Sequence, residues 1–235
     1  SLDALALAYT HTFALLGRSA KVDLALPGVC YEGEGTFQGV PRRGERCEVA
    51  DPSLKLSWNF IGSPAQTLDE FQMAENQLVA GASLQAGVPW GTYHQEHLLN
   101  AGTNRWMLKP GLGMSYRQNS LQYELIGTVS LFEDNREAFN QSILAQDPLY
   151  AVQAHLIYLM AQGRWLALNT NYFWGGQTWR NGVAEDTEQN NSRVGITFAM
   201  PLSPRHSLRL DVSQGVITRI GNDFTTLGMS WVYRF

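Results

Sequence analysis

Polar and charged side chains recur at every second position in several stretches of the chain; Lys55, for example, lies between Leu54 and Leu56. Since side chains alternate between the two faces of a β-strand, such residues would share one face of a sheet. If that face encloses a lumen, the charges either set solute selectivity or pair with one another and stabilise the wall. Their mixed sign argues against a strongly anion- or cation-selective pore. The set is Asp23, Lys55, Lys109, Glu124, Gln153, His155, Arg193, Arg209, Asp211 and Arg234.

A second set on the same predicted face is apolar. Apolar residues make up a larger share of this face than a water-filled pore would favour. Such side chains offer a path to hydrophobic molecules, or they pack against a plug inside the wall. The set is Met107, Ile126, Phe132, Ile157, Trp165 and Phe173, with Leu159 and Val232.

Enzymatic chemistry would need a nucleophile beside a general base. The histidines are His11, His94, His97, His155 and His206, and no serine lies two residues from any of them. Ser207 follows His206, but on adjacent positions of a turn. A metal site at His94 and His97 is the weaker interpretation of a polar loop. We therefore predict no enzyme, no metal and no cofactor.

The two cysteines, Cys30 and Cys47, flank a polar stretch rich in glycine and charge. In an oxidising compartment they are predicted to form a disulfide. A zinc pair is the poorer alternative, because no nearby histidine completes a site.

The elements that carry these residues are predicted from a period of two in the apolar residues, which is typical of β-strands. Eleven such strands follow one another, of roughly 9–13 residues, the length with which a tilted strand crosses a bilayer. Strands of a soluble sandwich, the alternative, are shorter. Aromatic residues at strand ends, such as Phe60, Tyr116 and Tyr158, are typical of membrane barrels. The apolar alternation covers 5–13, 22–26, 54–60, 78–88, 106–116, 121–131, 150–160, 166–174, 194–200, 208–212 and 227–235.

Composition agrees with this pattern. The chain has 235 residues with 16% charged residues, and its net charge of -4 does not suggest a nucleic-acid partner. No apolar run approaches the roughly 18 residues of a membrane helix. We therefore predict an all-β fold, a transmembrane antiparallel up-and-down β-barrel, as a single domain over residues 1–235.

The connections alternate between short turns and long polar loops, which is the pattern of outer-membrane barrels. The connection at 61–77 is long although it lies on the short-turn side, and residues 67–76 are predicted to form a helical turn. The terminal Phe235 ends an alternating aromatic strand and resembles the signal of the outer-membrane assembly machinery; an ordinary final strand is the alternative. Because single-chain bacterial barrels have even strand counts, we expect twelve strands, with one strand and a plug segment upstream of Ser1.

Prolines mark a candidate weak seam in the wall, because proline donates no ladder hydrogen bond. Pro27 and Pro89 are predicted to end strands, and Pro110 to lie inside one. These residues are candidates for a lateral opening. The alternative is that they only end or kink strands.

Five sequence blocks resemble one family of outer-membrane channels, named for the MetA pathway of phenol degradation. The resemblance spans nearly the whole chain. It implies a twelve-stranded barrel whose N-terminal segment enters the lumen, with small hydrophobic compounds as cargo. The cysteines look like a local feature of this chain. The blocks are AYTHTF at 8–13, GRSAKVD at 17–23, LNAGTNRW at 99–106, QDPLY at 146–150 and NSRVG at 191–195.

Together these observations predict a bacterial outer-membrane channel for the uptake of small hydrophobic, for example aromatic, compounds. The alternatives are a narrow diffusion porin for small polar solutes and a lipid-modifying barrel enzyme. Expected partners are outer-membrane lipid, the hydrophobic cargo and the barrel assembly machinery. We expect a monomer and no nucleic acid.

Overall fold

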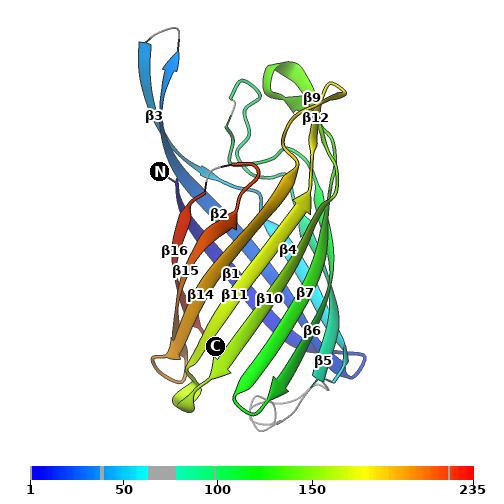
Figure 1. Cartoon of the computed structure of the whole chain (residues 1–235), viewed down its shortest axis with the longest axis vertical. Coiled ribbons are helices and arrows are strands. Elements are labelled where there is room, and N and C mark those ends of the chain that lie inside the picture. Colours follow the sequence, from blue (N-terminus) through cyan, green and yellow to red (C-terminus); the bar gives the residue numbers. More distant parts are fainter. Residues whose placement is uncertain (1, 38–39, 63–77, 98, 222) are drawn as a thin grey trace.

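The computed structural model describes residues 2–37, 40–62, 78–97, 99–221 and 223–235. Its main element is an antiparallel sheet that curves into a tall wall, with neighbouring strands following one another in chain order (Figure 1). The predicted helical turn at 67–76 lies outside the described residues. The strands of the wall are β1 (Leu2–Leu15), β2 (Arg18–Phe37), β4 (Ser53–Ile61), β5 (Leu78–Gly87), β6 (Met107–Gln118), β7 (Leu121–Phe132), β10 (Leu149–Leu159), β11 (Trp165–Gly175), β14 (Gln189–Pro201), β15 (His206–Ile217) and β16 (Thr225–Tyr233).

This wall confirms the predicted all-β, antiparallel up-and-down architecture with eleven strands. Strand alternation gives it two different faces. The outer face carries large apolar side chains that remain exposed, such as Leu108 at 43% and Leu168 at 51%. Few hydrophobic side chains of the described residues are buried, and all of these are alanines. The outer leucines thus have no protein core to enter, which is the pattern of a sheet whose apolar face lies against lipid.

The two ends of the wall approach each other without pairing among the described residues. The rings of Tyr9 on β1 and Phe235 after β16 stack with centroids 5.9 Å apart. The outer leucines of these edge strands are the more exposed, with Leu5 and Leu227 each at 81%. An edge strand lacks a neighbour on one side, and this explains the difference.

Short turns join the strands at one end of the wall, which we call the turn end. The β1–β2 turn places Leu16 and Gly17 at φ 52° and 71°, and Asn119 in the β6–β7 turn has φ 54°. Glycine and asparagine are the residue types that tolerate this left-handed region best. Among the described residues, the long connections lie at the opposite end, which we call the loop end. No helix in the described part of the chain is both long and apolar enough to span a membrane.

At the loop end, β2 continues beyond the wall and pairs with β3 (Val40–Val49) as a two-stranded ribbon (Figure 1). Pro27 therefore does not end its strand, contrary to the prediction. It faces Ala6 of β1, and its carbonyl accepts the N–H of Ala50. On its other side, β2 pairs with β4 up to Ala25 and with β3 from Gly28. Pro27 thus lies where β2 changes partner and an N–H donor is dispensable.

A second, four-stranded sheet is built from two of the predicted loops. It is formed by β8 (Asn135–Ala138), β9 (Ser142–Gln146), β12 (Thr178–Arg180) and β13 (Val183–Ala184). Single-turn 3₁₀ segments lie at Phe139–Gln141 and Ala161–Gly163. The small sheet joins the connections that follow β7 and β11 at the loop end of the wall (Figure 1).

Candidate functional site

The strand registers bring the sequence-predicted site residues onto the inner face of the wall. Asp23 pairs with Lys55, Lys55 with Gln85, and Gln85 with Lys109. Further round the wall, Glu124 pairs with His155 and His155 with Asn169. Directly paired residues of neighbouring strands point to the same face. The same argument places Gln153, Arg193, Arg209 and Asp211 on this face, while Arg234 follows the end of β16.

The inner face encloses a cavity of about 370 Å³ between β1 and β7. Small side chains and glycines leave this space open, among them Ser57, Gly81, Ser83 and Gly113. A Cβ atom at Gly113 would meet Ile126 Cγ1 at 3.5 Å, which is an ordinary contact. The cavity size lies in the range of small-molecule sites.

Some charged groups within this region form ion pairs and others do not. Lys21 Nζ lies 3.1 Å from an oxygen of Asp23, and the Thr10 hydroxyl donates to the same carboxylate at 2.7 Å. Glu124 accepts from the Gln122 amide at 2.6 Å. Lys55 lines the cavity with no ion pair to any residue within the described ranges. In the described part of the chain, Lys55 and Glu124 therefore both keep their charge inside the wall without an ion pair.

A row of neutral polar groups follows the opposite side of the interior. The ring Nδ1 of His155 lies 2.7 Å from Asn169 Oδ1, and the Asn169 amide donates to the Thr197 hydroxyl at 2.9 Å.

Arg209 and Asp211 form a longer ion pair of 3.8 Å. Arg193 donates to the backbone carbonyl of Phe224 at 3.0 Å and so holds the last loop against the wall.

The predicted apolar residues also lie on the inner face, but they do not form one patch. Met107 pairs with Phe132 near the loop end, and Gly113 pairs with Ile126 beside the cavity. Ala151 pairs with Phe173, and Leu159 with Trp165 towards the turn end. Ile157 faces Ala167.

The sequence prediction missed Arg105. Its side chain covers the ring of Phe132, the apolar residue near the loop end. Its guanidinium carbon lies 4.7 Å from the ring centroid of Phe132, and one Nη donates to Gln146 Oε1 at 2.5 Å. Burial lowers the pKa of Arg105 below its ordinary value, and the charge of Asp134 partly opposes this. Arg105 and Gln146 both belong to sequence blocks that carried the family resemblance. That resemblance is the signal that could have identified them.

The loop at 88–106 is fixed by Asp51. One carboxylate oxygen accepts the N–H of Gly91 at 2.9 Å, and the other accepts the N–H and the hydroxyl of Thr103 at 2.7 and 2.6 Å. The buried Asn135 amide donates to Tyr93 Oη at 2.9 Å and to the carbonyl of Thr103 at 3.1 Å. These bonds give Thr103 a structural role within the block at 99–106.

The three candidate prolines have different surroundings. Pro89 follows the end of β5, as predicted. Pro110 lies inside β6 and pairs with Leu84 of β5. On its other side, the β6–β7 pairing runs from Leu108–Leu131 to Gly111–Thr128 and omits the two positions between, in an unchanged register. The wall is thus locally unpaired where proline supplies no N–H.

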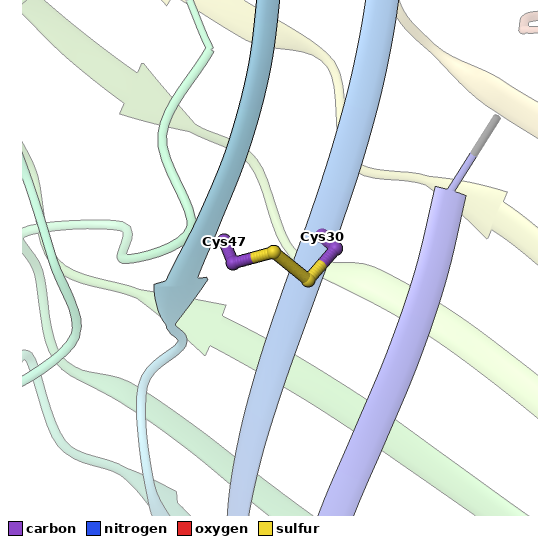
Figure 2. Close-up of a disulfide and its surroundings, with 2 residues drawn as sticks. All are labelled: Cys30 and Cys47. Atoms are coloured by element: carbon purple, nitrogen blue, oxygen red, sulfur yellow. A yellow bond between two sulfur atoms is a disulfide. The ribbon is translucent and has the colours of Figure 1, made fainter.

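Cys30 and Cys47 face each other across the β2–β3 ribbon and are joined by a disulfide (Figure 2). Their Cα atoms lie 4.0 Å apart. The pair ties β3 to β2 at the base of the ribbon, where Cys30 also faces Asp3 of β1.

The histidines occupy separate places. His11 stacks between Tyr9 and Phe13 on the outer face, and His206 stacks on Trp231. The His94 and His97 rings lie 4.9 Å apart, and His97 contacts the Arg46 guanidinium. Within the described residues no histidine ring is hydrogen-bonded to a serine hydroxyl.

An antiparallel meander with a lipid-type outer face and a partly polar, hollow interior defines the β-barrel class of outer-membrane folds. The crystal structure of the COG4313 outer membrane channel from Pseudomonas putida F1 has the same fold, with a TM-score of 0.84 and 19% sequence identity. The alignment covers 100% of this chain and 84% of that one.

The family described as "Putative MetA-pathway of phenol degradation" matches residues 1–233, and the chain belongs to this family. The predicted resemblance is thereby confirmed. No curated protein matches the chain.

Proposed function

We propose that the protein is an outer-membrane channel for the uptake of small hydrophobic compounds, such as aromatics. The hollow inner face carries this proposal. Glycines and serines open the cavity, and apolar side chains including Ile126 and Phe132 line the same face. Membership of a family named for phenol degradation and the channel described for the Pseudomonas structure support it.

Release to the side, through the wall, is the route we propose for such cargo. A hydrophobic molecule that leaves the lumen sideways avoids the aqueous space below the membrane. The unpaired positions at Lys109 and Pro110 between β6 and β7 are the candidate seam. Pro27 and Pro89 are weaker candidates, because Pro27 lies at a change of strand partner and Pro89 lies beyond β5.

We further propose that one upstream strand completes the barrel between β1 and β16. The high exposure of Leu5 and Leu227 supports a missing neighbour at these edges. In this arrangement the outer face contacts lipid, the channel is a monomer, and Phe235 serves as the signal for the assembly machinery. The stacking of Phe235 on Tyr9 is consistent with a position at the closing edge.

The experiment fills the cavity from one glycine and compares it with a glycine on the opposite face. A Gly113→Phe side chain points into the cavity, whereas a Cβ at Gly127 has open space around it and points outward. Cells with an intact outer membrane that express each variant are supplied with radiolabelled naphthalene. We expect uptake with Gly127→Phe to equal wild type and uptake with Gly113→Phe to fall to the level of cells without the protein.

Folding of both variants is checked by heat-modifiable migration in gels. If the folded Gly113→Phe variant takes up naphthalene like wild type, the cavity is not the route and the proposal is wrong.

The second candidate function is a narrow diffusion channel for small polar solutes. The polar row of His155, Asn169 and Thr197 on the inner face favours it. Swelling of liposomes in arabinose separates the two functions, because a polar diffusion channel gives rapid swelling and a hydrophobic route does not. For the lipid-modifying alternative, a lipase assay of the purified barrel is the direct test.

A further inference from the structure

We propose that the interior accepts amphipathic organic anions, in which an aromatic ring carries a carboxylate or sulfonate, and that Lys55 and Lys109 receive the anionic group. This inference rests on the proposed channel function and names a substrate class for the same site.

The mixed sign of the inner charges argued against strong selectivity, but two of the three acids of the inner face are held in ion pairs, with Lys21 and Arg209. Asp23 lies opposite Lys55 in the register, but its carboxylate is bound by Lys21 and Thr10. Asp211 forms an ion pair with Arg209, whereas Glu124 accepts from the neutral Gln122 amide and keeps its charge. Lys55 has no carboxylate within ion-pairing distance among the described residues, and neither has Lys109.

The two lysines act as one positive site. They flank Gln85 in the register of β4, β5 and β6, so all three side chains point to the interior. Lys55 and Lys109 are close enough to repel each other. An anion placed between two like charges removes this repulsion and gains attraction to both.

The sign of the interior differs from that of the whole chain, whose net charge is -4. Cationic side chains outnumber acidic ones on the inner face of the wall. A cleft whose charge has one net sign concentrates solutes of the opposite sign. The cations are Lys21, Lys55, Lys109, Arg117, Arg193 and Arg209, against the acids Asp23, Glu124 and Asp211.

The acids of the loop end are held by local contacts. Asp51 binds the 88–106 loop, and Glu185 binds Arg180 at 2.7 Å. Asp186 pairs with Arg219 at 2.7 Å, and Asp147 accepts from the Trp179 indole at 3.0 Å. The two ion pairs neutralise part of the negative charge that an incoming anion would meet.

Apolar surface lies next to the cationic site. Lys109 is two positions from Met107 on the same face of β6, and Met107 pairs with Phe132. Arg105 covers the Phe132 ring, and its second Nη is buried without a hydrogen-bond partner in the described part of the chain. A flat ring against Phe132 and Met107 would bring its anionic group to Lys109, with Arg105 as a further donor.

The test uses two aromatic probes that differ in charge and do not cross bilayers unaided: benzenesulfonate and benzyltrimethylammonium. Their influx into liposomes containing the full chain is compared at low salt. We expect about a tenfold preference for the anion. The double variant Lys55→Gln/Lys109→Gln should bring the ratio close to one, and each single variant should give an intermediate ratio. The control Arg164→Gln/Arg205→Gln removes the same charge from the turn end and should retain the preference.

Each outcome has a distinct meaning. Equal influx of both probes in the wild type, or an unchanged ratio in the lysine variant, overturns the anion preference while the channel stands. If neither probe enters and naphthalene uptake is also absent, the proposed channel function itself fails.

Discussion

Asp51 and Thr103 lie 52 residues apart in sequence, and one carboxylate oxygen of Asp51 accepts both the N–H and the hydroxyl of Thr103. A third bond reaches Gly91 through the other oxygen. Asp51 lies two residues before β4 begins at Ser53, so the loop at 88–106 is anchored close to the start of a wall strand. These three hydrogen bonds therefore fix the loop at the loop end of the wall.

Replacing Asp51 by alanine should release this loop without unfolding the wall. Hydrogen bonds to a charged group contribute about 1.5–3 kcal/mol each, so the loss of three should raise local opening strongly. Hydrogen–deuterium exchange over 88–106 should become faster, while β10 and β11 remain protected. As a control, Asp186→Asn breaks an exposed ion pair and should change little. Unchanged exchange in the Asp51 variant would show that the loop is held by other contacts.

Replacing Pro110 by valine should strengthen the seam between β6 and β7. The new N–H can complete the ladder that is interrupted beside Val129, and one hydrogen bond adds about 1 kcal/mol to the closed wall. If cargo leaves through this seam, naphthalene uptake should fall roughly fivefold. Pro204→Ala, in a turn at the opposite end, serves as the control. Normal uptake by a folded Pro110 variant would argue against the lateral route.

Acidification should loosen the small sheet at the loop end. Hydrogen bonds from Thr178 and then Arg180 lower the pKa of Glu185 below its ordinary value. A carboxyl with a lowered folded-state pKa stabilises the fold above its unfolded pKa, and this contribution disappears as the pH falls through the folded pKa. Amide resonances of β12 and β13 should therefore shift as the pH falls below the ordinary range of a glutamate pKa. Glu185→Gln should remove most of that dependence; an unaltered pH response in this variant would assign it to another group.

Reducing the disulfide should affect the ribbon and leave the wall intact. Cys30 and Cys47 are separated by 17 residues, and closing a loop of this size contributes roughly 3 kcal/mol by restricting the unfolded chain. Exchange in β3 should accelerate after reduction or in Cys30→Ser/Cys47→Ser, while the thermal unfolding of the wall is unchanged. A matching loss of wall stability would mean that ribbon and wall fold as one unit.

The sequence predicted the wall because lipid imposes a strict period on it. Residues such as Lys55 and His155 were assigned to the inner face from alternation, and the strand registers place them there. The same alternation places Lys21, two positions from Asp23, on the inner face. It would therefore have identified the ion pair between these two residues.

The ribbon and the loop contacts were beyond such reasoning. Both faces of a ribbon that stands clear of lipid can be polar, so β3 carries no apolar period and was predicted as a loop. Contacts such as Asp51 with Thr103 join irregular segments, where no periodicity records which residues meet. Glu185 and Arg180 escaped for the same reason, because they lie in a short hairpin within a long connection.

The scarcity of buried side chains in this wall has a consequence for how the protein can change. Along each strand, one set of residues lies on the apolar outer face and the alternate set lies on the inner face, and among the described residues only alanines are buried hydrophobic groups. In the channel that we propose, a substitution at Gly113, Lys55 or Ile126 alters the interior without requiring the outer leucines to repack. Selectivity and membrane anchoring can therefore evolve as two nearly independent traits, one residue at a time.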